Sequence, residues 1–151
     1  MIEKVNIRKL KVIPDERGAL MEMMRNDSPE FAKFGQVYLT IGFPGIVKGW
    51  HYHKVQYDHF FVVKGMIKLV LFDMREDSAT KDEINEFFIG EKNPVTVNIP
   101  PYVVHGFKAI GVEPAYLINV ATEVYDYKKP DEFRIHPHDN DIPYDWSLKE
   151  G

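Results

Sequence analysis

Two histidines that stand two residues apart, His51 and His53, are the side chains of this chain best suited to chemistry, and Asp58 follows after four residues. On an extended backbone, residues two apart point to the same side of a sheet. A third histidine, His105, lies far downstream in the segment Ile99–Phe107. Imidazole and carboxylate groups can ligate a divalent ion, and a histidine can also transfer protons near neutral pH. The four residues therefore predict either a metal site or a proton-transfer site.

The segments that must position these residues have the composition of β-strands. They are rich in β-branched and aromatic residues, and turn signals such as Pro44-Gly45 and Lys64-Gly65 separate most of them. The predicted strands are Val5–Ile7, Leu10–Val12, Leu20–Met24, Val37–Ile41, His59–Val63, Met66–Phe72, Val95–Ile99 and Ala115–Ala121. One short helix is predicted over Ser28–Lys33, with Ser28 as its cap and Pro29 at the first helical position. The pattern favours an all-β jelly-roll barrel or sandwich with minimal helix.

Length and composition limit the classes of function. The chain has 151 residues, so we expect one domain over residues 1–151 with a sizeable core. A net charge of −4 argues against a partner such as nucleic acid or a membrane surface, both of which require a basic face. No apolar run approaches the length of a membrane span, and the start of the chain has no signal-peptide pattern. With no cysteine as well, we expect a cytoplasmic protein.

The spacing of His51, His53, Asp58 and His105 is similar to that of the two metal-binding motifs of the cupin superfamily. The resemblance implies a cupin-type jelly roll. It leaves open a site in which these four residues hold a divalent metal ion as cofactor, with free positions for a substrate.

A more specific resemblance covers nearly the whole chain. Six ordered motifs resemble the dTDP-4-dehydrorhamnose 3,5-epimerase family: Asp15–Gly18 followed by Glu22, then Gln36, then Lys48–Tyr52, then Asp73–Thr80, then Ile99-Pro100 with His105–Phe107, and lastly Ala121-Thr122 with Tyr125. Ile142 and Trp146 complete the series. This family implies a metal-free, cofactor-free homodimer of cupin fold that acts on nucleotide-linked 4-keto sugars, here a dTDP-linked substrate.

The resemblance also implies roles for individual residues. His51 would remove the proton alpha to the C4 ketone, which gives an enediolate, and Tyr125 would relay a proton or orient the sugar ring. The remaining family positions would bind the nucleotide sugar; they are Arg17, Glu22, Gln36, Tyr38, Lys48, His105 and Glu132. Tyr144 and Trp146 are interpreted as packing residues, and His136 and His138 are left out of the site.

Three positions depart from the family pattern. Lys48 stands where the family has arginine, Asp58 where it has lysine, and Asn119 where it has the tyrosine that serves as general acid. A second resemblance, to the dTDP-4-keto-6-deoxyglucose 3,4-ketoisomerases, rests on His51–Lys54, Val37-Tyr38 and Ala121–Asp126. There the histidine pair would be catalytic, with His53 or Tyr38 returning the proton. Four hypotheses remain open: an epimerase, a ketoisomerase, a metal-dependent cupin enzyme, and a non-catalytic module that binds sugar nucleotides.

Overall fold

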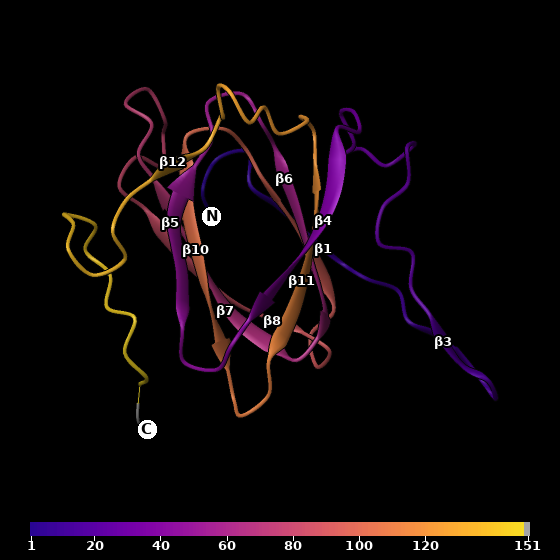
Figure 1. Ribbon diagram of the computed structural model, residues 1–151. Helices are drawn as coiled ribbons and strands as arrows, with labels where there is room; N and C mark the ends of the chain where they lie inside the picture. The colour runs from indigo at the N-terminus through magenta and orange to yellow at the C-terminus, as the bar shows by residue number, and fades with distance from the viewer. Residues whose placement is uncertain (150–151) are drawn as a thin grey trace.

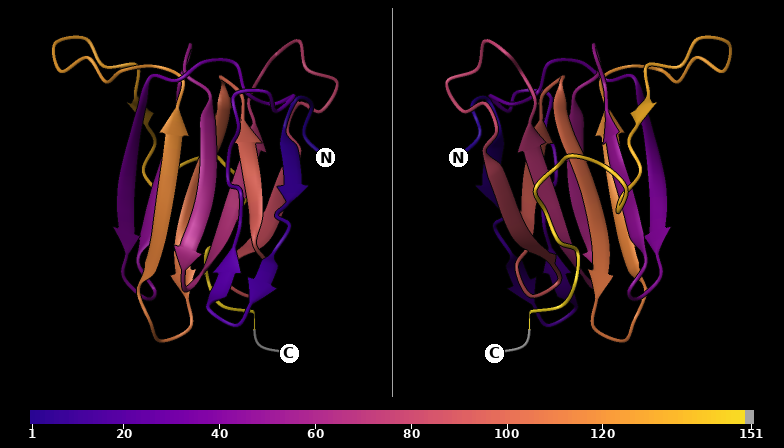
Figure 2. Two further views of the ribbon diagram at one scale, coloured as in Figure 1. Left: turned by 90° about the vertical axis from the view of Figure 1, so that its right-hand side faces the viewer. Right: turned by 90° about the vertical axis from the view of Figure 1, so that its left-hand side faces the viewer.

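The computed structural model describes residues 1–149, which fold into two facing five-stranded antiparallel sheets (Figure 1). The first sheet has the order β1-β9-β6-β11-β4, which Figure 2 (left) shows face-on, and the second has the order β12-β5-β10-β7-β8. The first sheet consists of β1 (Asn6–Lys9), β9 (Val95–Ile99), β6 (Asp58–Lys64), β11 (Ala115–Ala121) and β4 (Gln36–Gly42). The second consists of β12 (Phe133–Arg134), β5 (Val47–Tyr52), β10 (Val103–Ile110), β7 (Met66–Asp73) and β8 (Ile84–Gly90).

The main core lies between the two sheets, where alternate residues of each strand point inward. On β7 these are Ile67, Leu69 and Leu71, which are fully buried, and Val97 of β9 and Leu117 of β11 face them from the other sheet. This period-two burial is what the apolar alternation in the sequence predicts. The predicted all-β jelly-roll fold of cupin type is confirmed.

A second apolar cluster covers the outer face of the second sheet. Trp50, Val70 and Val104 pack there against Trp146 of the C-terminal segment, which crosses this face in Figure 2 (right). Tyr144 belongs to the same cluster. The interpretation of Tyr144 and Trp146 as packing residues is confirmed.

A two-stranded arm projects from the body of the molecule (Figure 1, right). It consists of β2 (Ile13–Asp15) and β3 (Gly18–Leu20), and every residue from 11 to 22 is exposed. Within residues 1–149, no helix is long and apolar enough to cross a membrane. The cytoplasmic location stays a prediction.

Several elements differ from the sequence predictions. Ser28–Lys33 is not a helix, because a six-residue helix forms too few hydrogen bonds to offset the free-energy cost of nucleation. The segment forms turns, in which Phe31 N donates to Ser28 O. The predicted strand Leu20–Met24 is wrong beyond Leu20, and Leu10–Val12 precedes a strand rather than forming one. Five strands of the structure, β2, β5, β8, β10 and β12, were not among the predicted strands.

Candidate active site

A bulge in β5 sets the direction of the side chains at the centre of the site. His105 of β10 pairs with His51, whereas Phe107, two residues on, pairs with Lys48, three residues back. One extra residue is therefore accommodated on β5, which lets Lys48 and His51 face the same cavity although they are three apart. Gly49 is needed here, because a Cβ at this position would lie 2.6 Å from Gly106 Cα.

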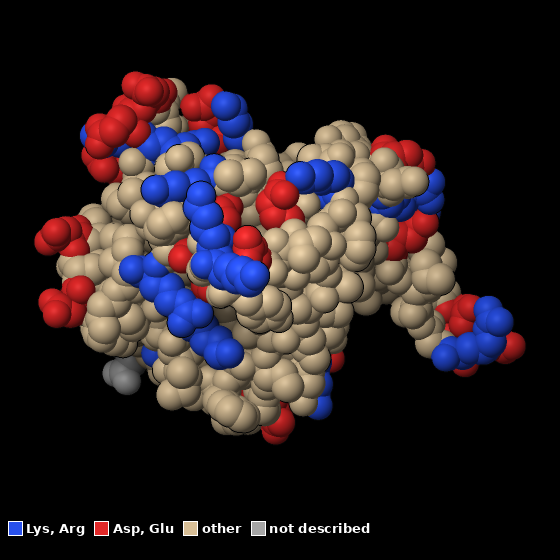
Figure 3. All heavy atoms as spheres, turned by 45° about the horizontal axis from the view of Figure 1, so that its top comes forward, with Lys and Arg blue, Asp and Glu red and all other residues tan. Residues whose placement is uncertain are grey.

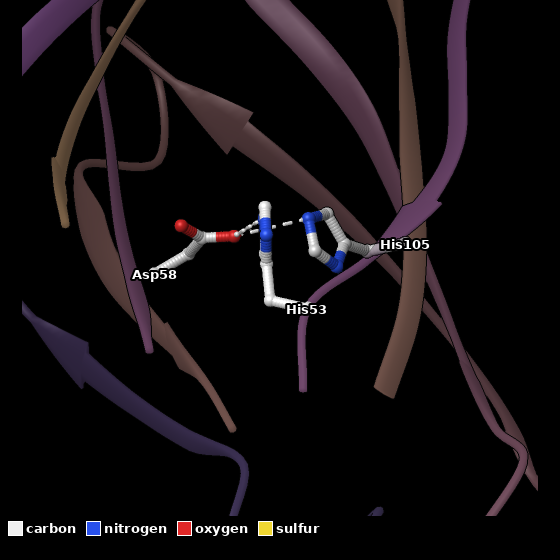
Figure 4. Close-up of side chains that lie close together, drawn as sticks. All are labelled: His53, Asp58 and His105. Carbon is white, nitrogen blue, oxygen red and sulfur yellow. Dashed lines mark ion pairs between the residues drawn. The ribbon is translucent and has the colours of Figure 1, made fainter. Parts of the chain in front are cut away.

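A buried carboxylate, Asp58 at the start of β6, is surrounded by four side chains from three segments: the loop between β5 and β6, strand β10 and strand β11. Its Oδ2 lies 3.2 Å from His53 Nε2 and 3.1 Å from His105 Nε2 (Figure 4). Its Oδ1 accepts hydrogen bonds from Gln56 Nε2 at 2.7 Å and from Asn119 Nδ2 at 2.6 Å. Each carboxylate oxygen therefore has two side-chain nitrogen atoms within 3.2 Å.

The backbone fixes the orientation of both imidazoles. His105 Nδ1 donates to the carbonyl oxygen of Val103 at 3.0 Å, and His53 Nδ1 donates to the carbonyl oxygen of Asp131. Asp131 also accepts hydrogen bonds from three backbone N–H groups of residues 54–56, which holds this loop in place. With each Nδ1 hydrogen committed to a carbonyl, each Nε2 faces Asp58, although His105 Nε2 is not aligned for a hydrogen bond.

Burial and neighbouring charges shift the pKa values of His53, Asp58 and His51 in different directions. Burial alone would lower the pKa of His53, but Asp58 and the carbonyl of Asp131 raise it to about 9. Burial would raise the pKa of Asp58, but His105 and His53 hold it well below its usual range. The pKa of His51 is lowered well below its usual range, first by burial and then by the nearby charges of His105 and His53. His51 is therefore neutral at neutral pH, as a proton acceptor must be.

A cavity of about 640 Å³ opens in front of His51, which is a size that suits a small ligand. Residues from both sheets and from the C-terminal segment line it, among them Tyr38, Lys48, His51, Phe60, Phe107, Glu132, Arg134 and His136. Figure 3 shows a band of lysine and arginine side chains on the upper face of the molecule. Lys48 and Arg134 bring positive charge to the cavity wall, where an anionic group of a ligand could bind.

The structure brings most of the predicted site residues together. Tyr38, Lys48, His51 and Glu132 line the cavity. His53 and His105 form a network with Asp58 outside this lining, and the ring centroid of His105 lies 4.3 Å from that of His51. Tyr125 does not line the cavity, but its hydroxyl lies 3.5 Å from Glu132 Oε2, and its backbone N–H donates to Gln36 Oε1 at 3.1 Å. Gln36 and Tyr125 therefore adjoin the cavity through these contacts.

Two predicted residues lie away from this cavity. Arg17 is on the projecting arm, where it pairs with Asp15, and Glu22 pairs with Arg25. All four side chains are largely exposed. Within one copy of the chain, neither Arg17 nor Glu22 lines the cavity.

The sequence did not indicate two residues that line the cavity, Arg134 and His136. The short strand β12 returns to pair with β5 and places Arg134 opposite His51. His136, which was left out of the predicted site, follows directly and lines the same cavity. Only this strand pairing brings them to the site, and no local spacing signals it.

The metal hypothesis is reduced from four ligands to three. Among residues 1–149, His53, Asp58 and His105 form the one group whose ligand atoms all lie within 4.8 Å of one another, and His51 is not part of it. Two imidazoles and a carboxylate suit a divalent transition metal, so these three residues fit such an ion. When bound, it would polarise a ligand oxygen as a Lewis acid.

Sequence comparisons relate this chain to known proteins. The family model for the polysaccharide biosynthesis C-terminal domain matches residues 13–133. A probable low-salt glycan biosynthesis epimerase of Haloferax volcanii is 46% identical over 150 residues, which are 98% of this chain and 96% of that protein.

Two solved structures are similar over almost the whole chain. The crystal structure of a dTDP sugar isomerase from Desulfovibrio desulfuricans has a TM-score of 0.91 and 32% identity, covering 99% of this chain and 94% of that one. A dTDP-6-deoxy-D-glucose-3,5-epimerase from Legionella pneumophila, solved with dTDP-4-keto-L-rhamnose, has a TM-score of 0.85 and 26% identity, covering 99% and 81%.

Proposed function

Because this chain belongs to the polysaccharide biosynthesis C-terminal domain family, we propose that it is an epimerase or isomerase of a nucleotide-linked 4-keto-6-deoxysugar. The observation that carries the proposal is His51, a neutral imidazole on the wall of a cavity of about 640 Å³. The names of the similar enzymes, a dTDP sugar isomerase and a glycan biosynthesis epimerase, support this substrate class.

The residues of the cavity suit the steps of such a reaction. His51 removes the proton alpha to the C4 ketone, and the electron pair moves onto the C4 oxygen to form an enediolate. Lys48 and Arg134 provide positive charge for the developing oxyanion or for the diphosphate. Glu132, Gln36 and Tyr125 bind the nucleotide sugar at the cavity rim. The bond that breaks is a C–H bond and the same ketone is restored, so we propose that no cofactor takes part.

Deuterium exchange tests this proposal. We expect the protein, incubated in D2O with dTDP-4-keto-6-deoxyglucose, to introduce deuterium at C3 or C5, seen by NMR. Dialysis against EDTA is expected to leave the rate unchanged within about twofold. Exchange at C3 with migration of the ketone to that carbon would assign a ketoisomerase rather than an epimerase. Binding of dTDP without exchange would contradict the proposal and favour a non-catalytic binding module.

The same experiment distinguishes a metal-dependent reaction from the metal-free one. If EDTA abolished exchange and Zn²⁺ or Mn²⁺ restored it, the three residues His53, Asp58 and His105 would be metal ligands rather than a hydrogen-bonded ion cluster. Elemental analysis of the protein before and after dialysis would then show a stoichiometric ion. That outcome would contradict the metal-free mechanism.

We also propose that the protein is a homodimer, because strand β4 leaves an apolar surface uncovered. β4 is the edge strand of its sheet, and its outward side chains Val37, Leu39 and Ile41 are 56%, 52% and 38% exposed. Unpaired edges and contiguous exposed apolar residues mark interaction surfaces. A second copy that lays its arm on this edge would also bring Arg17 and Glu22 toward a cavity, as their predicted roles require.

Sedimentation velocity tests the dimer. We expect the wild-type protein to sediment as a dimer of 17.6 kDa chains, and Leu39→Lys to shift the population toward monomer because a charge replaces a buried contact. Val112→Lys changes a residue that is 88% exposed in a turn, so it serves as the matched control and should stay dimeric. A monomeric wild-type protein would contradict this proposal.

A further inference from the structure

Asn119 occupies the position at which the family resemblance places the general acid, and its amide cannot donate a proton to carbon. The side chain is fully buried, and its Oδ1 accepts a hydrogen bond from His59 N at 3.0 Å. Its Nδ2 lies 2.6 Å from Asp58 Oδ1 and 2.8 Å from the hydroxyl oxygen of Tyr38. Asn119 thus connects the buried ion cluster to a phenol on the neighbouring strand.

The pairing of two strands makes this contact possible. Tyr38 of β4 and Asn119 of β11 are direct cross-strand partners, so their side chains leave the sheet on the same face. Tyr38 lines the cavity, as does His51. Tyr38 belongs to the first sheet and His51 to the second, so the phenol and the imidazole stand on opposite walls of one cavity.

The direction of the hydrogen bond leaves the phenol free to act. Because Asn119 Nδ2 donates to the Tyr38 oxygen, the hydroxyl hydrogen of Tyr38 is not used in that contact. Among the described residues, the Tyr38 O–H has no acceptor of its own. A ligand in the cavity can therefore receive this hydrogen.

We propose that Tyr38 is the proton donor that works opposite His51, and that Asn119, held by Asp58, is its positioning residue. This inference rests on the proposed function. His51 takes the proton from the carbon next to the ketone, and the enediolate forms. Tyr38 then delivers its hydroxyl proton to the same carbon from the opposite face, the ketone is restored, and the configuration is inverted. The phenolate regains a proton from water, and the His51 imidazolium returns its proton to water, so the reaction needs no other reactant.

The electrostatics agree with this assignment. Burial first, and then the negative charge of Asp58, raise the pKa of Tyr38 to about 12. The phenol is therefore protonated at neutral pH and can donate when the enediolate develops beside it.

Substitution of Tyr38 by phenylalanine tests the inference, because it removes only the hydroxyl. Without an opposite donor, His51 can return a proton only to the face from which it took one. We therefore expect Tyr38→Phe to keep deuterium exchange into the unreacted sugar within about fivefold of wild type, while inverted product falls by about 10²-fold or more. The measured quantity is the ratio of exchange to inversion.

Two further variants and one control sharpen this reading. Asn119→Leu removes the tether of the phenol and should raise the same ratio by about tenfold, an effect that a loss of stability alone would not produce. Tyr125→Phe should leave the ratio unchanged, because exchange and inversion slow together when a binding contact is lost. Tyr116→Phe, on β11 but outside the cavity, is the matched control and should behave as wild type.

The possible outcomes distinguish the inference from the function on which it rests. If the wild-type protein inverts the sugar and Tyr38→Phe inverts it at an unchanged rate, Tyr38 is not the donor and the inference is overturned. If the wild-type protein shows no exchange with 4-keto nucleotide sugars, the proposed function itself fails. A Tyr38→Phe protein that loses exchange and inversion equally would also overturn the assignment.

Discussion

Replacement of His51 by asparagine is expected to lower deuterium exchange and product formation by at least about 10³-fold, because it removes the proposed base. The residue is well suited to a clean test. No hydrogen bond of the His51 side chain is formed within residues 1–149, where its closest ring contact is His105 at 4.3 Å between centroids. The fold should therefore lose no more than about 1 kcal/mol of stability on this substitution.

The control for this variant is His138→Asn. His138 is exposed and does not line the cavity, so its replacement changes the same chemical group without touching the proposed site. Its turnover should remain within about twofold of wild type. Retained exchange in His51→Asn, at a rate close to that of wild type, would show that another group is the base. Binding of dTDP, measured by calorimetry, should persist in both proteins.

Replacement of Asp58 by asparagine is expected to be the most destabilising single change in the site. Asp58 is 1% exposed and lies within 3.2 Å of two imidazoles that are themselves buried. Removal of one partner from a buried ion cluster costs about 3–5 kcal/mol. The histidines can release their protons, which limits the penalty, so we expect a loss of about 3 kcal/mol and a decrease in Tm of roughly 6–12 °C. Asp141→Asn, at an exposed position, is the control.

The pH dependence of stability gives a second readout for the same cluster. The pKa of His53 is about 9 in the folded protein against 6.5 when unperturbed, so the folded state binds this proton more tightly. The resulting stabilisation is complete below pH 6.5 and is lost as the pH rises through 9. Wild-type Tm should therefore fall between pH 7 and about 9.5, and the fall should be much smaller in Asp58→Asn. Parallel curves for the two proteins would show that Asp58 does not hold the charge of His53.

The fold was predictable where burial follows a simple period. Strands β4, β6, β7, β9 and β11 were predicted to within about one residue at each end, because their inward residues alternate with outward ones. The apolar residues Phe87, Phe88 and Ile89 followed by Gly90 carry a comparable signal for β8. The prediction of a helix at Ser28–Lys33 was wrong, because a favourable cap stabilises only a segment that is long enough to nucleate a helix.

The site was predictable only in part, because the local sequence does not determine the register in which two distant strands pair. The spacing of His51, His53 and Asp58 indicated a cluster, and the structure confirms that His53, Asp58 and His105 meet. The contact between Tyr38 and Asn119 depends on how β4 aligns with β11, and Arg134 reaches the cavity because β12 returns to β5. Both are long-range pairings, which depend on the packing of the whole barrel rather than on the residues nearby.

The bulge in β5 makes the number of residues between Lys48 and His51 part of the chemistry. In a regular strand, residues three apart face opposite sides, so a positive charge and a base at this spacing could not serve the same substrate. The extra residue shifts the alternation by one, so that Lys48 and His51 face the same side of the strand. Trp50 packs into the apolar cluster on the outer face of the sheet. Insertion or deletion of one residue between Lys48 and His51 would restore the regular alternation of the strand and turn one of the two side chains away from the cavity. In this segment the number of residues is therefore as important for the site as the side chains that they carry.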